Sequence, residues 1–371
     1  VSALDFLPGR RMVRVPGWLL EKWKIRCENR MMAIRQINFF INLALAVLIV
    51  LTHSAGIKES AAAALGIEGH NTVVDQAGRS LVIDRPFERI ISLYGAHTEN
   101  LFNLGLDDEI IGVSRHETYP PRALKKPVFS YREDPEKFLA ARPDLVIIRP
   151  MIDRGYPQFV SRLEKNGIAV LSLQPQNVAD MFVYWQILGL VGGKQQRALK
   201  MISQFETAVS DFKTLTDGKT TRKRVYFEAI HSKMKTFSPD SMAVFALETA
   251  GGVNVASDAK AVRNTNIAYY GKERILSHGR RIDVYLAQSG VMNNPTVEAI
   301  TNEPGFRTIK AVAEGEIYLI DEQIVSRPTM RLLDGIYTIG KILYPVDFSN
   351  KNPTKIYHEN TKVRKHEKVA K

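Results

Sequence analysis

Short apolar runs alternate with helix-like segments over residues 72–177. Residues 72–83 predict a β-hairpin turning at Ala77-Gly78, followed by four buried strands and two helices, one ending at Gly105 and one over 155–167. The four strands are Ile90–Leu93, residues 109–114, Leu145–Ile148 and Ala169–Leu173. Because these strands are apolar throughout and alternate with helices, they predict a parallel sheet covered on both faces.

The middle of the chain, residues 178–216, shows no strand pattern. A helix is predicted over Val178–Leu190, and Gly192-Gly193 separates it from a longer one. An apolar stripe at helical spacing marks the buried face of that longer helix: Ala198, Met201, Ile202, Phe205, Ala208, Val209 and Phe212. Its length predicts a connector between two lobes.

The alternation of strands and helices resumes over residues 222–345. Strands are predicted at Arg224–Ala229, Asp283–Ala287 and Glu316–Ile320, and helices over 241–250, near 272–277, near 296–301 and at Thr329–Leu343. The sequence therefore predicts an α/β protein with two lobes, 72–177 and 222–345, joined by the helices of 178–216. A cleft between two lobes is a favoured place for a ligand.

An export signal is predicted over residues 31–64. Its apolar core, residues 39–51, follows Arg35 and precedes the small residues Ala61–Ala64, and it is short for a membrane span. Residues 1–30 are interpreted as a mis-assigned upstream extension. Since no cysteine stands at the cleavage region, we expect a periplasmic protein without a lipid anchor. An uncleaved membrane anchor is the alternative.

The charge is concentrated in the two flanks. Residues 1–38 and 349–371 each carry a net charge of +5, whereas residues 39–348 carry only +2 of the total of +12. The folded body is thus nearly neutral, and nucleic acid is not an expected partner. Residues 349–371 lack any pattern and are predicted to be a disordered basic tail.

Familiar catalytic motifs are missing from the sequence. It contains no Gly-x-Ser-x-Gly elbow, no Gly-x-Gly-x-x-Gly after the first strand and no His-Glu-x-x-His. The single cysteine, Cys27, precedes the export signal, which excludes a thiolate site in the mature body. We therefore expect a binding protein with no catalytic residues and no resident cofactor. A periplasmic metal-dependent hydrolase is the competing enzyme hypothesis.

Cations and aromatic side chains follow several predicted strands. In open parallel sheets, ligands bind at the carboxyl ends of the strands, and arginine forks suit anionic oxygens. The alternative for each residue is an ordinary solvated loop charge. The candidate ligand-binding residues are Tyr94, His97, Arg115, Tyr119, Arg132, Arg149, Arg154, His231 and Arg327.

Two direct metal sites are weaker possibilities. The pair Tyr269-Tyr270 could ligate ferric iron, although adjacent side chains on a regular element diverge. The histidines His97, His116 and His231 could hold zinc or manganese, but no ligand spacing supports this. We therefore predict no metal site.

The ordered motifs of residues 72–345 resemble the iron-siderophore and cobalamin substrate-binding proteins of ABC importers. The similar stretches are VVDQAGRSLVI, PFERIISLYGAHTENLFNLGLDDEIIGVS, TYPP, PEKFLAARPDLVII, LETAGGVNVA, KERIL and GEIYLIDEQIVSRPTMRLLDGIYTIGKILYP. The resemblance implies two Rossmann-like lobes with parallel sheets and one rigid bridging helix. Residues 292–306 do not match the family pattern clearly.

The resemblance also implies partners and roles. Glu136 and Glu273 match the glutamates that dock each lobe onto the permease, and Tyr119 matches a residue lining the ligand cleft. The implied partners are the permease and ATPase subunits of an importer, and the binding protein itself is expected to be a monomer. Because the predicted cleft is rich in arginine, we expect an anionic ferric siderophore, with haem or cobalamin as alternatives. Tyr94, His97 and Tyr119 are the candidate ligands of a haem iron.

Overall fold

The structure is a computed structural model that describes residues 65–262 and 265–349. All of these residues belong to one compact unit. The predicted upstream extension 1–30, the signal 31–64 and the tail beyond Ser349 lie outside the described residues. No helix among the described residues combines the length and apolar character needed to cross a membrane.

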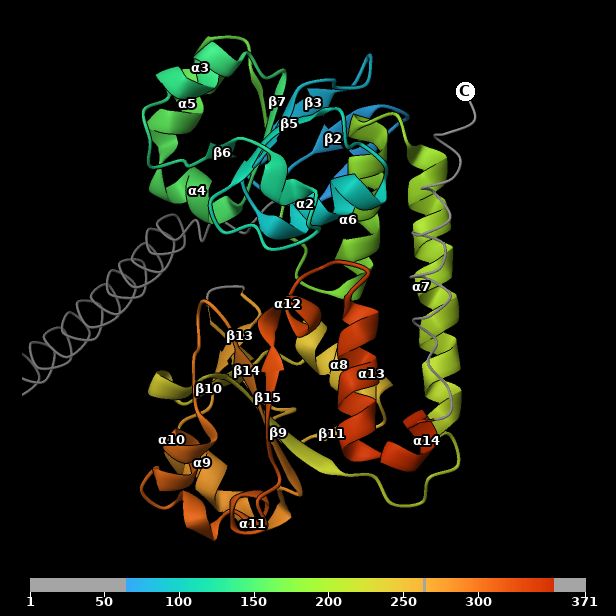
Figure 1. The fold of residues 1–371 in the computed structure, drawn as a ribbon, viewed down its shortest axis with the longest axis vertical. Coiled ribbons are helices and arrows are strands. Elements are labelled where there is room, and N and C mark those ends of the chain that lie inside the picture. The colour runs from blue at the N-terminus through green and yellow to red at the C-terminus, as the bar shows by residue number, and fades with distance from the viewer. Residues whose placement is uncertain (1–64, 263–264, 350–371) are drawn as a thin grey trace, which may run out of the picture. The chain divides into compact units, whose positions relative to one another are not determined.

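The N-terminal lobe is built on a five-stranded sheet of order β6-β5-β4-β7-β8, in which every pairing is parallel (Figure 1). A small antiparallel sheet, β1-β2-β3, contains the predicted hairpin. The strands are β1 Gly66–Glu68, β2 Thr72–Val74, β3 Ser80–Val82, β4 Ile90–Ser92, β5 Ile110–Ser114, β6 Val128–Phe129, β7 Leu145–Ile148 and β8 Ala169–Ser172. The helices are α2 Gly95–Asn103, α3 Glu136–Ala141, α4 Pro150–Gly155 and α5 Pro157–Lys165.

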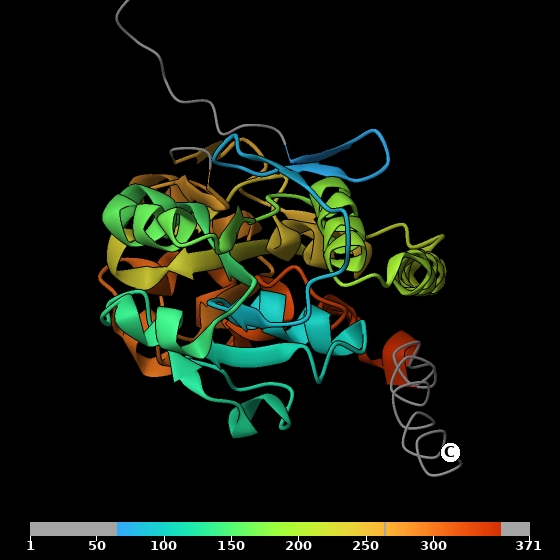
Figure 2. The ribbon, with the colours of Figure 1, turned by 90° about the horizontal axis from the view of Figure 1, so that it is seen from above.

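Two helices connect the lobes, as predicted. Helix α6 (Val178–Val191) is capped by the side chain of Asn177, and α7 (Gln195–Thr216) follows the break at Gly192-Gly193. The predicted stripe from Ala198 to Phe212 is buried along α7. Figure 1 shows α7 running beside both lobes, and Figure 2 views it end-on.

The C-terminal lobe has a seven-stranded sheet of order β12-β13-β10-β9-β14-β15, with β11 also paired to β9. Its strands are β9 Arg224–Ile230, β10 Lys235–Phe237, β11 Val253–Asn254, β12 Lys260–Ala261, β13 Ile267–Tyr269, β14 Val284–Ser289 and β15 Ile317–Asp321. Its helices are α8 Met242–Thr249, α9 Lys272–Ser277, α10 Val297–Asn302, α11 Lys310–Ala313, α12 Glu322–Val325, α13 Leu332–Leu343 and α14 Pro345–Ser349.

This second sheet is mixed, which corrects the expectation of two fully parallel sheets. Strands β11, β9, β14 and β15 are parallel, but β10 pairs antiparallel with β9, and β13 antiparallel with β10. Only residues 231–234 separate β9 from β10, and Met234 takes a left-handed conformation with φ of 47°. So short a connection can reverse the chain but cannot make the crossover that a parallel pair requires.

The largest apolar core runs through both lobes and the connector. It includes Leu145 from β7, Trp185 from α6, Phe205 from α7 and Phe227 from β9. Smaller cores lie on the other face of each sheet, around Phe138 in the N-terminal lobe and around Tyr285 in the C-terminal lobe. Both sheets are thus buried on two faces, as their apolar strands predicted.

Candidate functional site

The carboxyl ends of the two sheets meet each other. Thr118, which follows β5, donates a hydrogen bond to the side-chain oxygen of Gln323 in α12 at 2.5 Å. Asn100 in α2 donates to the carbonyl of Pro328 in the C-terminal lobe at 2.9 Å. In Figure 1, α2 and α12 lie at the junction of the lobes. The loops at these strand ends therefore border the same region of the molecule, as the sequence predicted.

Aromatic and arginine side chains gather at the carboxyl end of the N-terminal sheet. We call six of them the basic-aromatic edge: Tyr94, Tyr131, Arg132, Arg149, Arg154 and Tyr156. The guanidinium of Arg149 lies 4.4 Å from the centre of the Tyr94 ring, and its Nε donates to the side chain of Gln174 at 3.1 Å. This cation–π contact fixes the direction of the Arg149 side chain after β7.

The second half of the edge consists of Tyr131 and Arg132, which follow β6, with Arg154 in α4 and Tyr156 directly after it. The rings of Tyr131 and Tyr156 meet edge to face with centres 4.7 Å apart, and Arg132 lies 5.7 Å from the Tyr131 ring. A hydrogen bond with Tyr156 raises the pKa of Arg132. Arg154 is exposed on α4. Within the described part of the chain, Arg132, Arg149 and Arg154 form no ion pair, so all three keep their charge available for an anion.

Arg115 and Tyr119 each have a partner outside the basic-aromatic edge. The Arg115 side chain is 63% exposed and forms an ion pair with Glu133 at 3.1 Å. Tyr119 is half-buried, and the guanidinium of Arg331 covers its ring at 4.3 Å. Burial raises the pKa of Tyr119. A ligand role for either residue stays a prediction.

His97 is enclosed by the N-terminal lobe. It is fully buried, its Nδ1 lies 2.7 Å from the Tyr184 hydroxyl, and its Nε2 lies 3.2 Å from the carbonyl of Ile148. Because a carbonyl only accepts, Nε2 donates to Ile148 and Nδ1 accepts from Tyr184. Burial lowers the pKa of His97 to about 3. With both ring nitrogens occupied, the structure does not offer this side chain to a haem iron or a metal.

His231 belongs to a polar network inside the C-terminal lobe. Its Nδ1 donates to the buried carboxylate of Glu228 at 2.8 Å, and its backbone N–H donates to the side chain of Asn293 at 2.9 Å. Tyr285 also donates to Glu228. The hydrogen bond with Glu228 raises the pKa of His231, which favours the imidazolium that this buried carboxylate needs.

This network holds a loop that presents apolar side chains. We call residues 290–293, which follow β14, the apolar loop: in it, Val291 and Met292 are 78% and 54% exposed. Asn293 anchors its end by donating to the carbonyl of Gln288 at 2.9 Å. A side chain at Gly290 would overlap Glu322, so this glycine lets the loop pack closely on α12. The C-terminal lobe therefore offers an apolar surface where the N-terminal lobe offers cations.

Arg327 is buried at the contact between the lobes. It is 9% exposed, and its Nη1 would overlap a Cβ at Gly95, the first residue of α2. The carboxylate of Glu117 lies on the same side of Gly95. Arg327 thus points into the N-terminal lobe, rather than into an open hollow shared with Arg149.

Three residues at this contact were not singled out from the sequence. The Arg331 guanidinium holds the Glu99 carboxylate with two parallel hydrogen bonds, and Glu117 accepts from the hydroxyls of Ser114 and Thr98. Burial raises the pKa of both carboxyls, and Arg331 and Arg327, respectively, oppose that shift. An acidic residue inside a helix normally faces solvent, so only the tertiary contact identifies Glu99.

The two predicted docking glutamates lie in the first turns of short helices. Glu136 begins α3 and is ion-paired with Arg162 at 2.7 Å, with 59% of its side chain exposed. Glu273 is exposed in the first turn of α9. Figure 1 shows α3 and α9 on the same side of the view, one in each lobe. Their contact with a permease stays a prediction.

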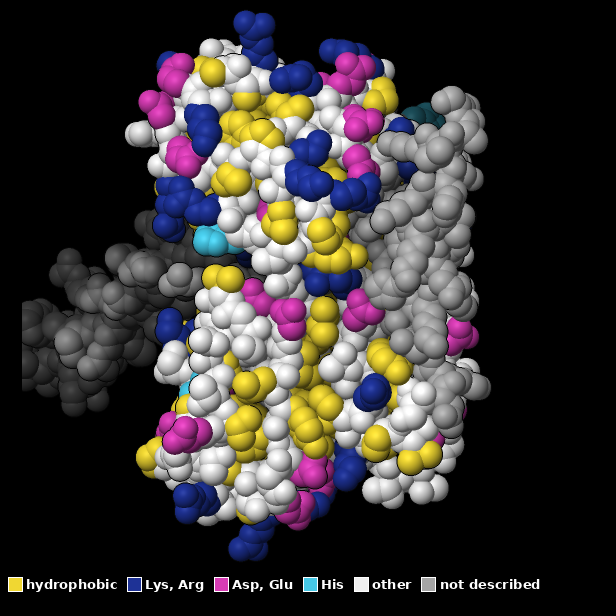
Figure 3. Space-filling view, viewed as in Figure 1, with side chains coloured by type: hydrophobic (Ala, Val, Ile, Leu, Met, Phe, Trp, Pro, Cys, Tyr) yellow, Lys and Arg dark blue, Asp and Glu magenta, His cyan; other side chains and the backbone are white. Residues whose placement is uncertain are grey.

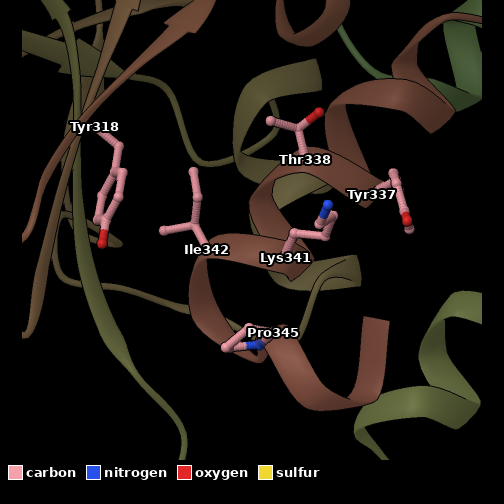
Figure 4. Close-up of a pocket in the computed structure, with 6 residues that line it drawn as sticks. All are labelled: Tyr318, Tyr337, Thr338, Lys341, Ile342 and Pro345. Atoms are coloured by element: carbon pink, nitrogen blue, oxygen red, sulfur yellow. The ribbon is translucent and has the colours of Figure 1, made fainter. Parts of the chain in front are cut away.

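A pocket of about 560 Å³ lies in the C-terminal lobe, away from the contact between the lobes. Figure 4 shows its lining: Tyr318 comes from β15, Pro345 from α14, and the remaining residues, Tyr337, Thr338, Lys341 and Ile342, from α13. In Figure 3, apolar side chains gather on this face of the lobe. The pocket contains none of the predicted ligand residues.

Neither predicted metal alternative is supported by the geometry. Tyr269 is 63% exposed and Tyr270 is 5% exposed, so the two side chains of this pair leave the chain on different sides. Within residues 65–262 and 265–349, no three His, Cys, Asp or Glu side chains are placed to hold a metal ion.

Comparison with known proteins gives the family. Residues 90–324 match the model of the periplasmic binding proteins. The chain belongs to this family. Its relatives include an ABC transporter substrate-binding lipoprotein of Bacillus subtilis, YvrC, which is uncharacterised and 24% identical over 75% of this chain and 86% of its own. They also include the vitamin B12-binding protein of Vibrio cholerae, which is 22% identical over 68% of this chain and 87% of its own.

Solved periplasmic binding proteins share the fold. A possible iron-binding protein from Staphylococcus epidermidis has a TM-score of 0.62 at 23% identity, covering 70% of this chain and 100% of that one. The haem-binding protein RhuT from Roseiflexus has a TM-score of 0.59 at 22% identity, covering 70% and 99%. These likenesses confirm two α/β lobes joined by a helical connector. The chain is therefore a periplasmic binding protein with the fold of these solved structures.

Proposed function

We propose that this periplasmic binding protein captures an anionic iron chelate between its lobes and delivers it to an ABC importer. It performs no chemistry on the ligand. ATP hydrolysis belongs to partner subunits, and the protein acts in the periplasm after export through the segment at 31–64.

The basic-aromatic edge is the observation that carries this proposal. Arg132 and Arg149 contact the rings of Tyr131 and Tyr94, Arg154 is exposed on α4, and none of the three forms an ion pair among the described residues. Guanidinium groups donate to the oxygens of carboxylate or catecholate groups, and tyrosine rings cover flat parts of a ligand. The opposing apolar loop, with Val291 and Met292 exposed, suits the ligand's uncharged face.

Delivery would use one carboxylate on each lobe. Glu136 and Glu273 are both exposed, and they lie on different lobes. Two separated anionic anchors suit a basic surface formed by a pair of permease subunits. The long connector α7 leaves few torsions for hinge motion, so we expect capture and release to involve small lobe movements.

A corrinoid is the second candidate ligand. It is favoured by the sequence relatives, which include proteins named as vitamin B12-binding and, from Halobacterium salinarum, cobalamin-binding. Haem is the third, because RhuT is a haem-binding protein of the same fold. Against haem ligation by His97 stands its burial, which leaves Tyr94 and Tyr119 as the candidates for iron.

A ligand panel separates these candidates. The full chain is titrated with a ferric catecholate chelate, a ferric hydroxamate chelate, haemin and cyanocobalamin, while heat release and tryptophan emission are followed. The proposal predicts saturable 1:1 binding of a ferric chelate and weaker binding of cyanocobalamin. Binding of cyanocobalamin alone would replace the chelate with a corrinoid.

Haem needs its own readout. If haemin binds through iron, its Soret band shifts, and Tyr119→Phe or Tyr94→Phe removes that shift. If none of the four compounds binds, the proposed function fails.

A further inference from the structure

At the contact between the lobes, the N-terminal lobe contributes carboxylates and the C-terminal lobe contributes arginines. The N-terminal lobe supplies two carboxylates, Glu99 in α2 and Glu117 after β5. The C-terminal lobe supplies two arginines, Arg327 and Arg331, from the segment between α12 and α13. We call these four residues the lobe latch.

The first pair of the latch is complete. Arg331 Nε lies 3.0 Å from each oxygen of Glu99, and its Nη2 lies 2.8 Å from Oε2. Glu99 is fully buried, and only 11% of the Arg331 side chain is exposed. A buried bidentate pair contributes little net stability, but removing one partner leaves an uncompensated buried charge. Such a pair therefore specifies one arrangement of the lobes.

The second pair of the latch is incomplete. Nη1 of Arg327 and Oε2 of Glu117 are both buried, and neither has a hydrogen-bond partner among the described residues. Arg327 approaches the first turn of α2 so closely that its Nη1 occupies the space that a side chain at Gly95 would fill. Unpaired buried polar atoms destabilise this half of the contact, so less free energy is needed to separate it. The latch thus combines one hydrogen-bonded ion pair, Glu99 with Arg331, and one pair, Glu117 and Arg327, in which a buried polar atom of each side chain has no hydrogen-bond partner among the described residues.

Uncharged hydrogen bonds surround the latch. The carbonyl of Pro328, between the two arginines, accepts from Asn100 at 2.9 Å and from the indole of Trp185 at 3.2 Å. Gln323 accepts from Thr118 of the opposite lobe. Because Trp185 belongs to the connector helix α6, the segment 326–331 is tied to both the N-terminal lobe and the connector.

We infer that Glu99, Glu117, Arg327 and Arg331 form a latch between the lobes that sets their spacing when no ligand is present. These are positioning residues: they hold the basic-aromatic edge and the apolar loop at one separation. The inference concerns the ligand-free protein, so it holds whichever compound the protein carries.

The test measures the distance between the lobes directly. Spin labels are placed at Lys165→Cys in α5 and Glu298→Cys in α10, both exposed, in the full chain carrying Cys27→Ser. Pulsed dipolar spectroscopy without ligand should give one narrow distance distribution for this parent. Glu99→Gln should broaden the distribution and move it to longer distances.

A second variant guards against misfolding. Gly95→Ala adds one methyl group where Arg327 now lies, in a helix that alanine favours, so the protein folds while Arg327 is pushed out. It should also lengthen the distance between the lobes. The matched control is Asp153→Asn, which breaks a bidentate pair with Arg79 inside the N-terminal lobe and should leave the distribution unchanged.

Two outcomes would overturn the latch. One is a distribution for Gly95→Ala and Glu99→Gln that equals the parent's. The other is an equal broadening in Asp153→Asn, which would mean that any lost ion pair loosens the fold. Neither outcome bears on whether a ferric chelate binds, which the ligand panel decides separately.

Discussion

The two lobes present different chemistry at the edges that face each other. The N-terminal edge carries three arginines that form no ion pair among the described residues, and two of them, Arg132 and Arg149, contact tyrosine rings. In the C-terminal lobe, Arg327 and Arg331 lie against carboxylates of the N-terminal lobe, His231 lies against Glu228, and the apolar loop is exposed. Both edges are rich in cations in the sequence, but only one keeps them available for a ligand.

This difference assigns separate tasks to the two lobes. On the proposed function, the N-terminal lobe would recognise charge, whereas the C-terminal lobe would fix geometry and supply an apolar wall. Arg331 directs its Nε and Nη2 donors at Glu99 and Gln323, whereas Arg132, Arg149 and Arg154 hold no carboxylate among the described residues. The predictions below test this division, from the largest expected effect to the smallest.

The largest effect, on uptake, is expected at Glu136 and Glu273, because each lobe carries one of these predicted docking glutamates. Reversing both Glu136→Lys and Glu273→Lys should abolish uptake of the chelate by cells, because two anionic anchors become cationic. Ligand affinity of the purified protein should stay within about twofold, since exposed charges far from the site are screened. The matched control is Glu298→Lys, another exposed glutamate in a first helical turn. Undiminished uptake by the double variant would show that other residues dock.

The next effect separates the arginines of the two edges. Arg132→Ala combined with Arg149→Ala should weaken binding of the ferric chelate about 100-fold, since hydrogen bonds to charged groups contribute about 1.5–3 kcal/mol each. Arg115→Ala, at an exposed arginine already paired with Glu133, should change affinity less than about threefold because surface ion pairs contribute little. Calorimetric titration of all variants measures this. An equal loss of affinity in Arg115→Ala and in the Arg132→Ala, Arg149→Ala double variant would contradict the division of tasks between the lobes.

Two histidines give opposite pH dependences. Burial lowers the pKa of His97 to about 3. As the pH falls below the ordinary histidine pKa, the His97 imidazole therefore takes up a proton in the unfolded chain but stays neutral in the folded protein. Stability should therefore fall as the pH drops from about 6.5 towards 3, by up to about 1.4 kcal/mol per pH unit from this residue. Urea unfolding of wild type and His97→Gln at pH 7 and pH 4.5 measures it. The gap between the two proteins should shrink at pH 4.5, and a constant gap would contradict the assignment.

The smallest effect belongs to His231, whose pKa is raised by its hydrogen bond with Glu228. A raised pKa of this kind adds stability that is present below the ordinary histidine pKa and disappears as the pH rises through the raised value. His231→Gln should therefore lower the stability more at pH 6 than at pH 9. An equal loss at both values would mean that His231 contributes as a neutral side chain.

The fold was predictable from the sequence where its elements are long and periodic. The strands at Ile90–Ser92 and Leu145–Ile148 and the helix Gln195–Thr216 follow apolar patterns and occur as predicted. Strand β10, Lys235–Phe237, has three residues and no apolar pattern, so the sequence does not predict it or the antiparallel part of the second sheet. The predicted helix over 155–167 begins late, because Pro157 starts α5 anew after Tyr156.

The sequence predicts which types of side chain follow the strands but not which partners they meet. Arg149 and Arg327 are each followed directly by a proline. Their sequence surroundings are alike, but one stacks on Tyr94 and the other enters the opposite lobe beside Gly95. Which carboxylate an arginine meets depends on how the lobes pack, and no local pattern encodes the contact of Glu99 with Arg331 over 232 residues.

The position of the bound iron tests the account most directly. Crystals of the complex with a ferric chelate, measured at the iron absorption edge, locate the metal without assumptions about the ligand. The account predicts a single iron between the lobes, bordered by Arg149 and Tyr94 on one side and by Val291 and Met292 on the other. Iron in the pocket between β15 and α13, or elsewhere outside the space between the lobes, would contradict it.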